Sequence, residues 1–309
     1  MPDGAMADLV AMSRLGVLPR RHWLRRAAGL AILALLAWLA WEMVHNRAFG
    51  WDVFAHYVFA PDILRGLALT LRLTALVAVL GFAVGTILAV MRLSANPVLR
   101  LTSAFYVWIF RSVPLLVQLL FWYNIGYIVP RISIGIPFGR TLYAGDTRDL
   151  ITAMGAAILG LTCHEAAHAA EIVRGGIKAV NPGTVEAAHA LGLSETAILR
   201  HIVFPQAIPA ILPAAGNLII GTLKGTSIVS VIAVSDLLYS AQLIYNDNYQ
   251  IVPLLMVATM WYAVTTTVMS LLQGLIERHY RPYSREDGGT TRPFAFLRPR
   301  PLPPDAAET

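Results

Sequence analysis

The sequence is poor in charge, in lysine and in cysteine. Only 14% of its 309 residues are charged, whereas a soluble domain usually carries about a quarter. A mean hydropathy of +0.61 therefore argues against a soluble globular protein and predicts a chain that lies in lipid. The single cysteine, Cys163, excludes a disulfide framework. Lysine occurs only twice, so the net charge of +6 comes from arginine.

A nucleotide-binding loop is also missing. The phosphate-binding motif G-x-x-x-x-G-K-[ST] requires Ser or Thr directly after its lysine. In this sequence Lys178 precedes Ala179, and Lys224 precedes Gly225. If the function of this chain needs ATP, another chain must hydrolyse it.

Long apolar runs are abundant. A helix needs about 20 residues to cross a bilayer. Six stretches are long enough or nearly so: 27–44, 67–91, 102–129, 150–173, 207–234 and 251–276. The first follows the basic stretch RRHWLRR and could instead be a cleaved signal sequence. The long segment before it, together with Trp38 and Trp41 as interface anchors, favours a retained span. We predict an all-α integral membrane protein with six transmembrane helices.

The distribution of Lys and Arg predicts the orientation of these spans. The ends and loops on one side, 1–26, 92–101, 174–206 and 277–309, hold 16 of these residues. The loops on the other side hold 5. Cytoplasmic loops carry the excess of positive charge, so both termini should be cytoplasmic. The tail is rich in Pro and Arg, and we expect it to be disordered.

The largest loop on the cytoplasmic side encodes two short helices instead of a simple connector. Asn181 can cap the first helix, Pro182 suits its first position, and Gly192 can take a left-handed stop. Ser194 can cap the second helix, whose regular hydrogen bonding Pro205 should end. Val185, Ala188 and Leu191 should share one face, with Glu186 and His189 elsewhere. Such a helix can pack on its own bundle or dock into a partner, and spacing alone does not decide between them.

This loop resembles that of a known family. Glu186-Ala187-Ala188 is followed after three residues by Gly192 and after nine more by the sequence IVFP. The pattern is similar to EAA-x3-G-x9-I-x-L-P, which marks the membrane subunits of ATP-binding-cassette importers. Phe204 replaces the usual Leu, an apolar exchange. Further segments, FRSVPLLVQLLFWYN, AEIVRGGIKAVNPGTVEAAHALGLS and LKGTSIVSVIAVSDLLYSAQ, resemble the polar amino-acid uptake branch, the permeases for histidine, glutamate, glutamine, arginine and opines.

The resemblance implies a type I importer subunit in a bacterial inner membrane. Its partners would be an ABC ATPase dimer that binds ATP and Mg, a second permease subunit and an extracytoplasmic solute-binding protein. This chain itself would hold no cofactor, metal or catalytic residue. Its parts would be a cytoplasmic segment (1–26), an extra transmembrane helix with its external loop (27–60), the five-helix permease domain (61–282) and the tail (283–309). The implied ATPase-coupling residues are Glu186, Ala187, Ala188, Gly192, Ile202 and Pro205.

One motif suggests a different class. HEAAH, from His164 to His168, matches H-E-x-x-H, in which two His one turn apart bind zinc and the Glu acts as a base. A catalytic zinc site needs a third ligand, and no accompanying protease motif is present. The family's pattern also continues through this helix in register. An intramembrane protease is therefore the weaker interpretation. At the inner end of the same span, Glu171 and Arg174 should form a structural ion pair.

Polar residues inside the predicted spans are the candidates for a transport path. A charged group in the bilayer is costly, so such residues face the bundle interior and either line a path or pair with one another. Lys224 should have a partner such as Glu165, Asp236 or water. Hydroxyl groups can also bond between helices with no transport role. The candidates are Arg111, Gln118, Glu165, Lys224, Thr226 and Ser227.

Three functional classes remain distinct at this point. The first is an importer subunit for polar amino acids, with an opine or a compatible solute as the alternative substrate. The second is the zinc protease. The third is a secondary transporter or channel that works without a partner. The sequence does not name the transported solute, because an unseen binding protein shares the selectivity.

Overall fold

The computed structural model describes residues 23–135 and 141–280. Most of the predicted segment 1–26 and all of the tail 283–309 lie outside the described residues. The chain divides into two compact units, residues 1–51 and 52–309. The first unit contains α2 (Trp23–His45) and the turn η1 (Arg47–Phe49). The described side chains of α2 are exposed, and its apolar part Ala27–His45 matches the first predicted span.

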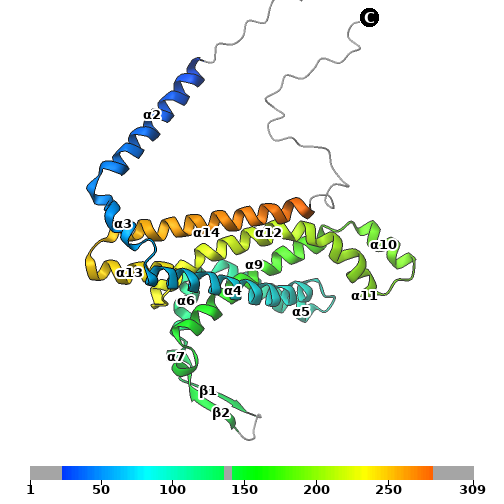
Figure 1. Ribbon diagram of the computed structural model, residues 1–309. Helices are drawn as coiled ribbons and strands as arrows, with labels where there is room; N and C mark the ends of the chain where they lie inside the picture. Colours follow the sequence, from blue (N-terminus) through cyan, green and yellow to red (C-terminus); the bar gives the residue numbers. More distant parts are fainter. Residues whose placement is uncertain (1–22, 136–140, 281–309) are drawn as a thin grey trace, which may run out of the picture. The chain divides into compact units, whose positions relative to one another are not determined.

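Helices make up most of the described residues of the second unit, which also contain one two-stranded sheet (Figure 1). From residue 51 onward the elements are α3 (Trp51–Tyr57), α4 (Pro61–Leu93), α5 (Pro97–Ser112), α6 (Leu115–Tyr123), α7 (Ile125–Ile128), β1 (Arg131–Gly135), β2 (Thr141–Asp146), α8 (Thr147–Leu150), α9 (Ala153–Lys178), α10 (Pro182–Ala190), α11 (Glu195–Ile198), η2 (Leu199–Val203), α12 (Phe204–Gly225), η3 (Thr226–Ile232), α13 (Leu237–Asn248) and α14 (Ile251–Tyr280).

Four helical stretches of the described chain are long and apolar enough to cross a membrane: Ala27–His45, Pro61–Leu93, Glu195–Ile232 and Ile251–Tyr280. A bent pair, α5 with α6, would make a fifth. The most buried helix, α9, does not meet the same test, because its 26 residues include two His and two Glu. At 1.5 Å per residue it is nevertheless about 39 Å long. The count of six spans stays a prediction.

The span predicted over 102–129 is broken into two helices at Pro114, a residue that can kink a helix. Between α5 and α6 the chain bends by 103°. Pro114 lacks a backbone N–H, and the residue before a proline avoids the helical region. Val113 is accordingly extended, with ψ of 130°. An apolar run alone cannot reveal this break, because both halves are hydrophobic.

An antiparallel hairpin interrupts the helical fold, so the all-α expectation is wrong at this point. Strands β1 and β2 pair with Arg131 opposite Asp146, in the segment between the third and fourth predicted spans. Figure 1 shows the hairpin projecting from the bundle beyond α7. The alternation of Ile132 and Ile134 with polar residues is typical of a strand.

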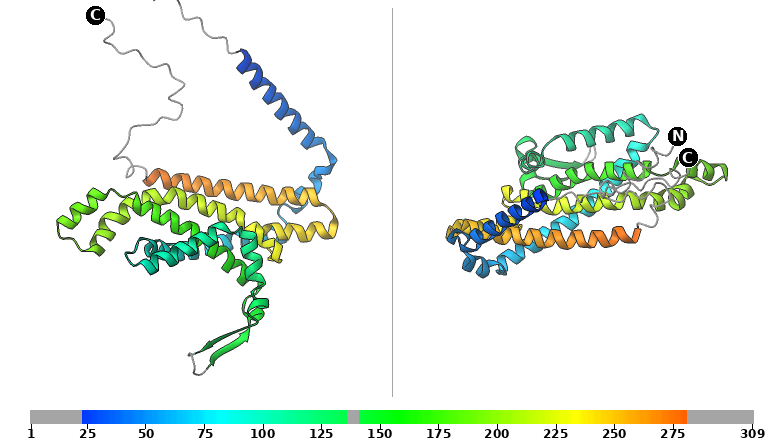
Figure 2. Two further views of the ribbon diagram at one scale, coloured as in Figure 1. Left: turned by 180° about the vertical axis from the view of Figure 1, so that it is seen from behind. Right: turned by 90° about the horizontal axis from the view of Figure 1, so that it is seen from above.

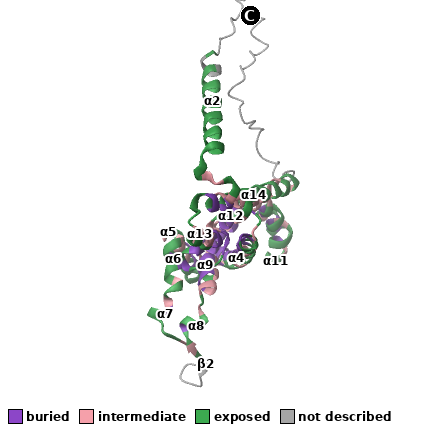
Figure 3. Ribbon diagram, turned by 60° about the vertical axis from the view of Figure 1, so that its left-hand side comes forward, coloured by how far each residue is buried: buried purple, intermediate pink, exposed green. Residues whose placement is uncertain are grey.

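Helix α9 lies at the centre of the second unit. It packs against α4 on one side and α12 on another, and α12 in turn packs against α14 (Figure 2). A Cβ atom on Gly85 of α4 would lie 2.7 Å from the Cβ of Ala169 and 2.9 Å from the carbonyl oxygen of Ala166. Small residues thus let the two backbones approach closely, as is common between helices in lipid. Buried residues lie along α4, α9, α12 and α13 (Figure 3).

Candidate functional site

The chain after α9 folds into two short helices, as the sequence predicts. Asn181 caps α10, since its Oδ1 accepts a 2.9 Å hydrogen bond from the amide of Gly183. Gly192 has a φ of +73°, in the left-handed region that side chains disfavour. Ser194 then caps α11 by accepting a 3.4 Å hydrogen bond from the amide of Ala197. We call residues 181–203 the coupling hairpin.

The coupling hairpin shares a small hydrophobic core with the end of α9 and the start of α12. The buried members of this core are Val180, Ala188, Ile198, Val203 and Ala207, with Ile177, Val185, Ile202 and Ile211 packed beside them. Within the EAA segment the three residues therefore have different surroundings: Ala188 is buried, whereas Glu186 and Ala187 are exposed.

Leu191 does not join the face of Val185 and Ala188. Helix α10 ends at Ala190, and Leu191 caps it with 81% of its surface exposed. Leu193, on the other side of Gly192, is 42% exposed. The predicted three-residue face is thus wrong at its last position, because the helix stops before it. Glu186, Ala187, Leu191 and Leu193 thus give the hairpin exposed side chains, one acidic and three apolar. An exposed carboxylate together with exposed apolar side chains is suited to contact with another protein.

The regular α-helical hydrogen bonding of the second helix is interrupted just before Pro205, as predicted, although the chain stays helical. Leu199–Val203 is a π-helical turn, in which the amide of Phe204 donates to the carbonyl of Leu199. Pro205 lies in the first turn of α12, where its missing N–H is tolerated. Glu195–Ile232 is therefore one continuous helical stretch of 38 residues. The hairpin is joined to a membrane-crossing helix without a flexible link.

The end of α9 next to the hairpin has one close contact with α12 and one ion pair within α9. A Cβ on Gly176 would collide with the side chain of Ile211 and lie 3.3 Å from the carbonyl oxygen of Ala207, so α9 and α12 touch closely here. The predicted ion pair is confirmed, since Nε of Arg174 donates to Oε1 of Glu171 at 3.2 Å. Both groups are about three-quarters buried.

The six candidate path residues do not form one group. Gln118, Glu165 and Thr226 are buried, Ser227 is half-buried, and Arg111 and Lys224 are exposed on this subunit. The hydroxyl of Thr226 donates to the carbonyl of Leu223 at 2.7 Å, and that of Ser227 donates to the carbonyl of Lys224 at 2.7 Å. These two hydroxyl groups therefore supply hydrogen-bond donors to carbonyl groups at the end of α12.

The side chain of Gln118 forms hydrogen bonds with backbone carbonyl groups at the break between α5 and α6. Its Nε2 donates to the carbonyl oxygens of Phe110 at 2.9 Å and of Val113 at 2.8 Å, and it lies 3.2 Å from Nδ1 of His164. The carbonyl groups at the end of α5 lose their helical partners at the bend. One amide side chain supplies the missing donor and links the break to α9.

Glu165 lies against α4 and does not pair with Lys224. A Cβ on Gly81 would be 3.0 Å from the Cβ of Glu165, and Oε2 of this carboxyl group has no hydrogen-bond partner among the described residues. The ion pairs of the described chain are 62–65, 171–174 and 189–195. Of the partners predicted for Lys224, Glu165 and Asp236 are therefore wrong, whereas contact with water stays a prediction. Lys224 is exposed, so it needs no buried partner in this chain.

The HEAAH segment does not form a metal centre in the described part of the chain. The rings of His164 and His168 are 4.8 Å apart between centroids. No group of three or more His, Cys, Asp or Glu side chains there is placed to hold a metal ion. His164 contacts Gln118, which gives it a structural role at the α5–α6 break.

A buried polar cluster around Asp236 was not predicted as a unit. Asp236 is fully buried; its Oδ1 accepts from the amide of Tyr239 at 2.9 Å and its Oδ2 from the hydroxyl of Tyr262 at 3.0 Å. Thr70 accepts from the amide of Leu237 at 3.0 Å. The cluster joins α4, α13 and α14 at the end of the unit remote from α10. An acidic residue directly before an apolar helix is a cap signal, and that is the only sign of it in the sequence.

Comparison with known proteins gives a family and relatives. The family described as the binding-protein-dependent transport system inner membrane component matches residues 78–282. The arginine transport system permease protein ArgU of Corynebacterium glutamicum is 40% identical over 264 residues, 85% of this chain and 82% of that protein. The nopaline transport system permease protein NocM of Agrobacterium fabrum is 35% identical over 239 residues, 76% of this chain and 94% of that protein.

Solved structures give a concordant result. A crystal structure of an amino acid ABC transporter with histidines is 35% identical, with a TM-score of 0.61, over 73% of this chain and 97% of that one. The MetNI methionine ABC transporter shares the fold at 23% identity and a TM-score of 0.55, over 71% of this chain and 95% of that one.

Proposed function

Because the chain belongs to the family of binding-protein-dependent transport system inner membrane components, we propose that it is the membrane subunit through which an ATP-binding-cassette importer takes up polar amino acids. Relatives named as permease proteins of arginine and glutamine transport systems support this substrate class. A relative named as a nopaline transport system permease protein supports an opine as the alternative substrate.

The partners follow from the family and from what this chain lacks. Without a phosphate-binding loop, the chain depends on a separate ATPase dimer that binds ATP and Mg. A second permease subunit, of the same or a related sequence, would complete the path, and a solute-binding protein would deliver the amino acid. We place the chain in a bacterial cytoplasmic membrane with both termini and the coupling hairpin inside, where the positive charge is concentrated.

One observation carries the mechanism: the coupling hairpin is continuous with a membrane helix. Glu195–Ile232 is a single helical stretch, and α10 is locked to its start by the small core around Ala188. A push on Glu186 and Ala187 by an ATPase is therefore transmitted to α12 as a rigid movement. Alternating access then requires that the ATP-bound ATPase dimer favours one arrangement of the bundle over the other.

The exposed polar residues support a path between two subunits. Arg111 and Lys224 face outward from this subunit and Ser227 is half-exposed, so a second subunit could enclose them with water and solute. Glu165 keeps one carboxylate oxygen without a protein partner, which fits a residue beside the path. Gln118 and Thr226 support the walls of the path through their hydrogen bonds.

The coupling role is tested by charge reversal on the hairpin. We expect Glu186→Lys to reduce substrate-stimulated ATPase activity of the complete transporter to its basal rate, because a charge buried at an interface and left unpaired typically costs about 2–5 kcal/mol. Asp247→Lys is the matched control, since Asp247 is equally exposed but lies on α13 at the opposite end. Stimulation equal to wild type in Glu186→Lys would refute the assignment.

The other functional classes predict different results. A secondary transporter would move solute in liposomes that contain this chain alone with an ion gradient. A zinc protease would lose peptidase activity on chelation. Co-purification of a cassette ATPase from mild detergent is expected only for the importer subunit.

A further inference from the structure

A pocket lies at the end of α9 that is remote from the coupling hairpin. It has a volume of about 310 Å³ and lies between α6, α7, α8 and the start of α9. Its polar lining residues are Tyr123, Asn124, Tyr127, Thr147, Arg148 and Thr152. The proposed topology places this end outside the cell, where the solute is delivered.

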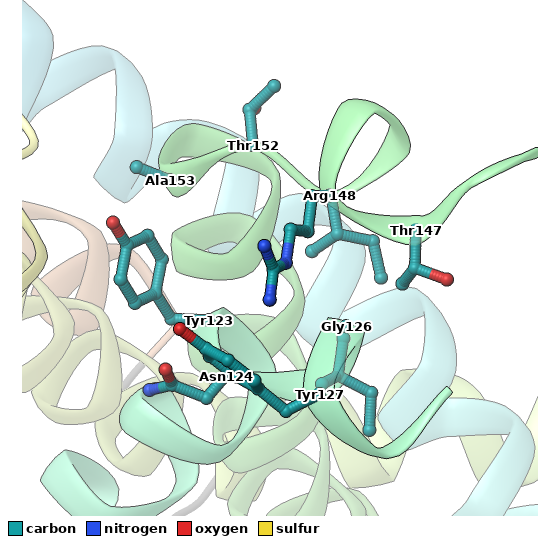
Figure 4. Close-up of a pocket in the computed structure, with 10 residues that line it drawn as sticks. Tyr123, Asn124, Gly126, Tyr127, Thr147, Arg148, Thr152 and Ala153 are labelled. Atoms are coloured by element: carbon teal, nitrogen blue, oxygen red, sulfur yellow. The ribbon is translucent and has the colours of Figure 1, made fainter. Parts of the chain in front are cut away.

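Arg148 is held in this pocket by neighbours that leave its charge free. Oδ1 of Asp146 accepts from the backbone amide of Arg148 at 2.9 Å, which fixes the start of α8. A Cβ on Gly126 would lie 2.9 Å from Cγ of Arg148, so the stem of the arginine crosses α7 where only glycine fits easily. The guanidinium carbon lies 4.5 Å from the centre of the Tyr127 ring. Figure 4 shows the group directed into the space between Tyr123 and Tyr127.

The guanidinium group has no carboxylate partner within the described residues, whose three ion pairs all lie elsewhere. Stacking on a tyrosine occupies its face and leaves the N–H edge open. That edge matches a carboxylate, which can accept two parallel hydrogen bonds.

Other groups in the pocket complement the remainder of an amino acid. Asn124 donates its amide N–H to the carbonyl of Leu120 at 2.8 Å, so its own carbonyl oxygen stays available as an acceptor. The ring of Tyr123 offers an aromatic face to a cation. The pocket thus has a positive charge at Arg148, and the carbonyl oxygen of Asn124 and the ring of Tyr123 can contact an ammonium group.

From this arrangement we infer that the pocket is an outer binding site for a free zwitterionic amino acid, whose α-carboxylate pairs with Arg148. The site rests on the proposed import function and adds an intermediate stop between the binding protein and the path. It recognises the charged backbone groups that all amino acids share. Selectivity for the side chain therefore stays with the binding protein.

The test measures binding to the permease–ATPase complex without its binding protein, in phosphatidylcholine nanodiscs. Radiolabelled L-arginine is the probe, and agmatine, which lacks the carboxylate, is the competitor. We expect saturable binding to wild type, a loss of about tenfold or more in affinity for Arg148→Gln, and weak competition by agmatine. Arg131→Gln, on strand β1 at the same end, is the control and should bind like wild type. Arg148→Lys should retain part of the affinity, which shows that the site still folds.

Three results would overturn the site. They are no saturable binding of L-arginine to wild type, equal affinity in Arg148→Gln, and equal competition by agmatine. Loss of L-arginine binding when phosphatidylglycerol replaces phosphatidylcholine would reassign Arg148 as a lipid anchor and would also overturn it. Each of these leaves the importer function standing, provided that Glu186→Lys still uncouples the ATPase.

Discussion

The hydroxyl group of Tyr262 donates a 3.0 Å hydrogen bond to a carboxylate oxygen of Asp236, and Asp236 is completely buried. The pair joins α14 to the start of α13. Asp236 comes three residues after Ala233, which has a φ of +59° and ends the helical stretch that begins at the coupling hairpin. The movement of α12 in transport would therefore be anchored at this point.

Removal of the tyrosine hydroxyl should weaken that anchor. Tyr262→Phe leaves a buried carboxylate with one partner fewer, so we expect a loss of about 1–3 kcal/mol in the free energy of unfolding. Unfolding of the detergent-solubilised protein measures this loss. Tyr245→Phe, a half-buried tyrosine on α13 whose hydroxyl forms no hydrogen bond within the described residues, should change little. Equal stability of the two variants would contradict the anchor.

Gly192 should be required for its backbone conformation and not for space. No atom lies within 4 Å of the position that a Cβ would take, but φ is +73°. A β-branched side chain in this region costs about 1–2 kcal/mol, whereas Asn tolerates it. We expect Gly192→Val to abolish substrate-stimulated ATPase activity while the protein still inserts, and Gly192→Asn to keep most of it. Similar rates in both variants would show that the turn does not matter for coupling.

The close approach of α4 and α9 should depend on Gly85. A methyl group there would meet Ala169 and the backbone of Ala166 at less than 3 Å, and the helices would have to separate. We expect Gly85→Ala to destabilise the protein by about 1–3 kcal/mol. Gly221→Ala, on α12 with nothing within 4 Å, should be neutral or stabilising, since alanine favours helix. Thermal unfolding of both variants compares the two sites.

We predict that the main role of Gln118 is to stabilise the fold and that contact with the transported solute is not its main role. Gln118→Leu removes the donor shared by the carbonyl groups of Phe110 and Val113, so we expect a loss of about 1–3 kcal/mol. Gln242→Leu, on α13, is the control, because no side-chain hydrogen bond links it to the described chain. Unchanged unfolding together with reduced uptake would assign Gln118 to the path instead of the bend.

Local chemistry in the sequence was enough to predict the coupling hairpin. Asn181, Gly192 and Ser194 each act through their nearest neighbours, so their cap and turn roles can be derived without a tertiary fold. Long apolar runs likewise predicted α2, α4, α12 and α14, because a bilayer-crossing helix satisfies its own backbone. The EAA pattern predicted the family, which the comparisons confirm.

Only the tertiary structure decided what the polar residues inside those helices contact. Gln118 lies at a break that Pro114 permits but does not require, and Lys224 is exposed on the surface of this chain. Arg148 and Tyr127 are 21 positions apart in the chain and meet only because α7 and α8 pack together. Helical periodicity fixes which residues share a face of one helix, but the packing between helices decides which faces meet.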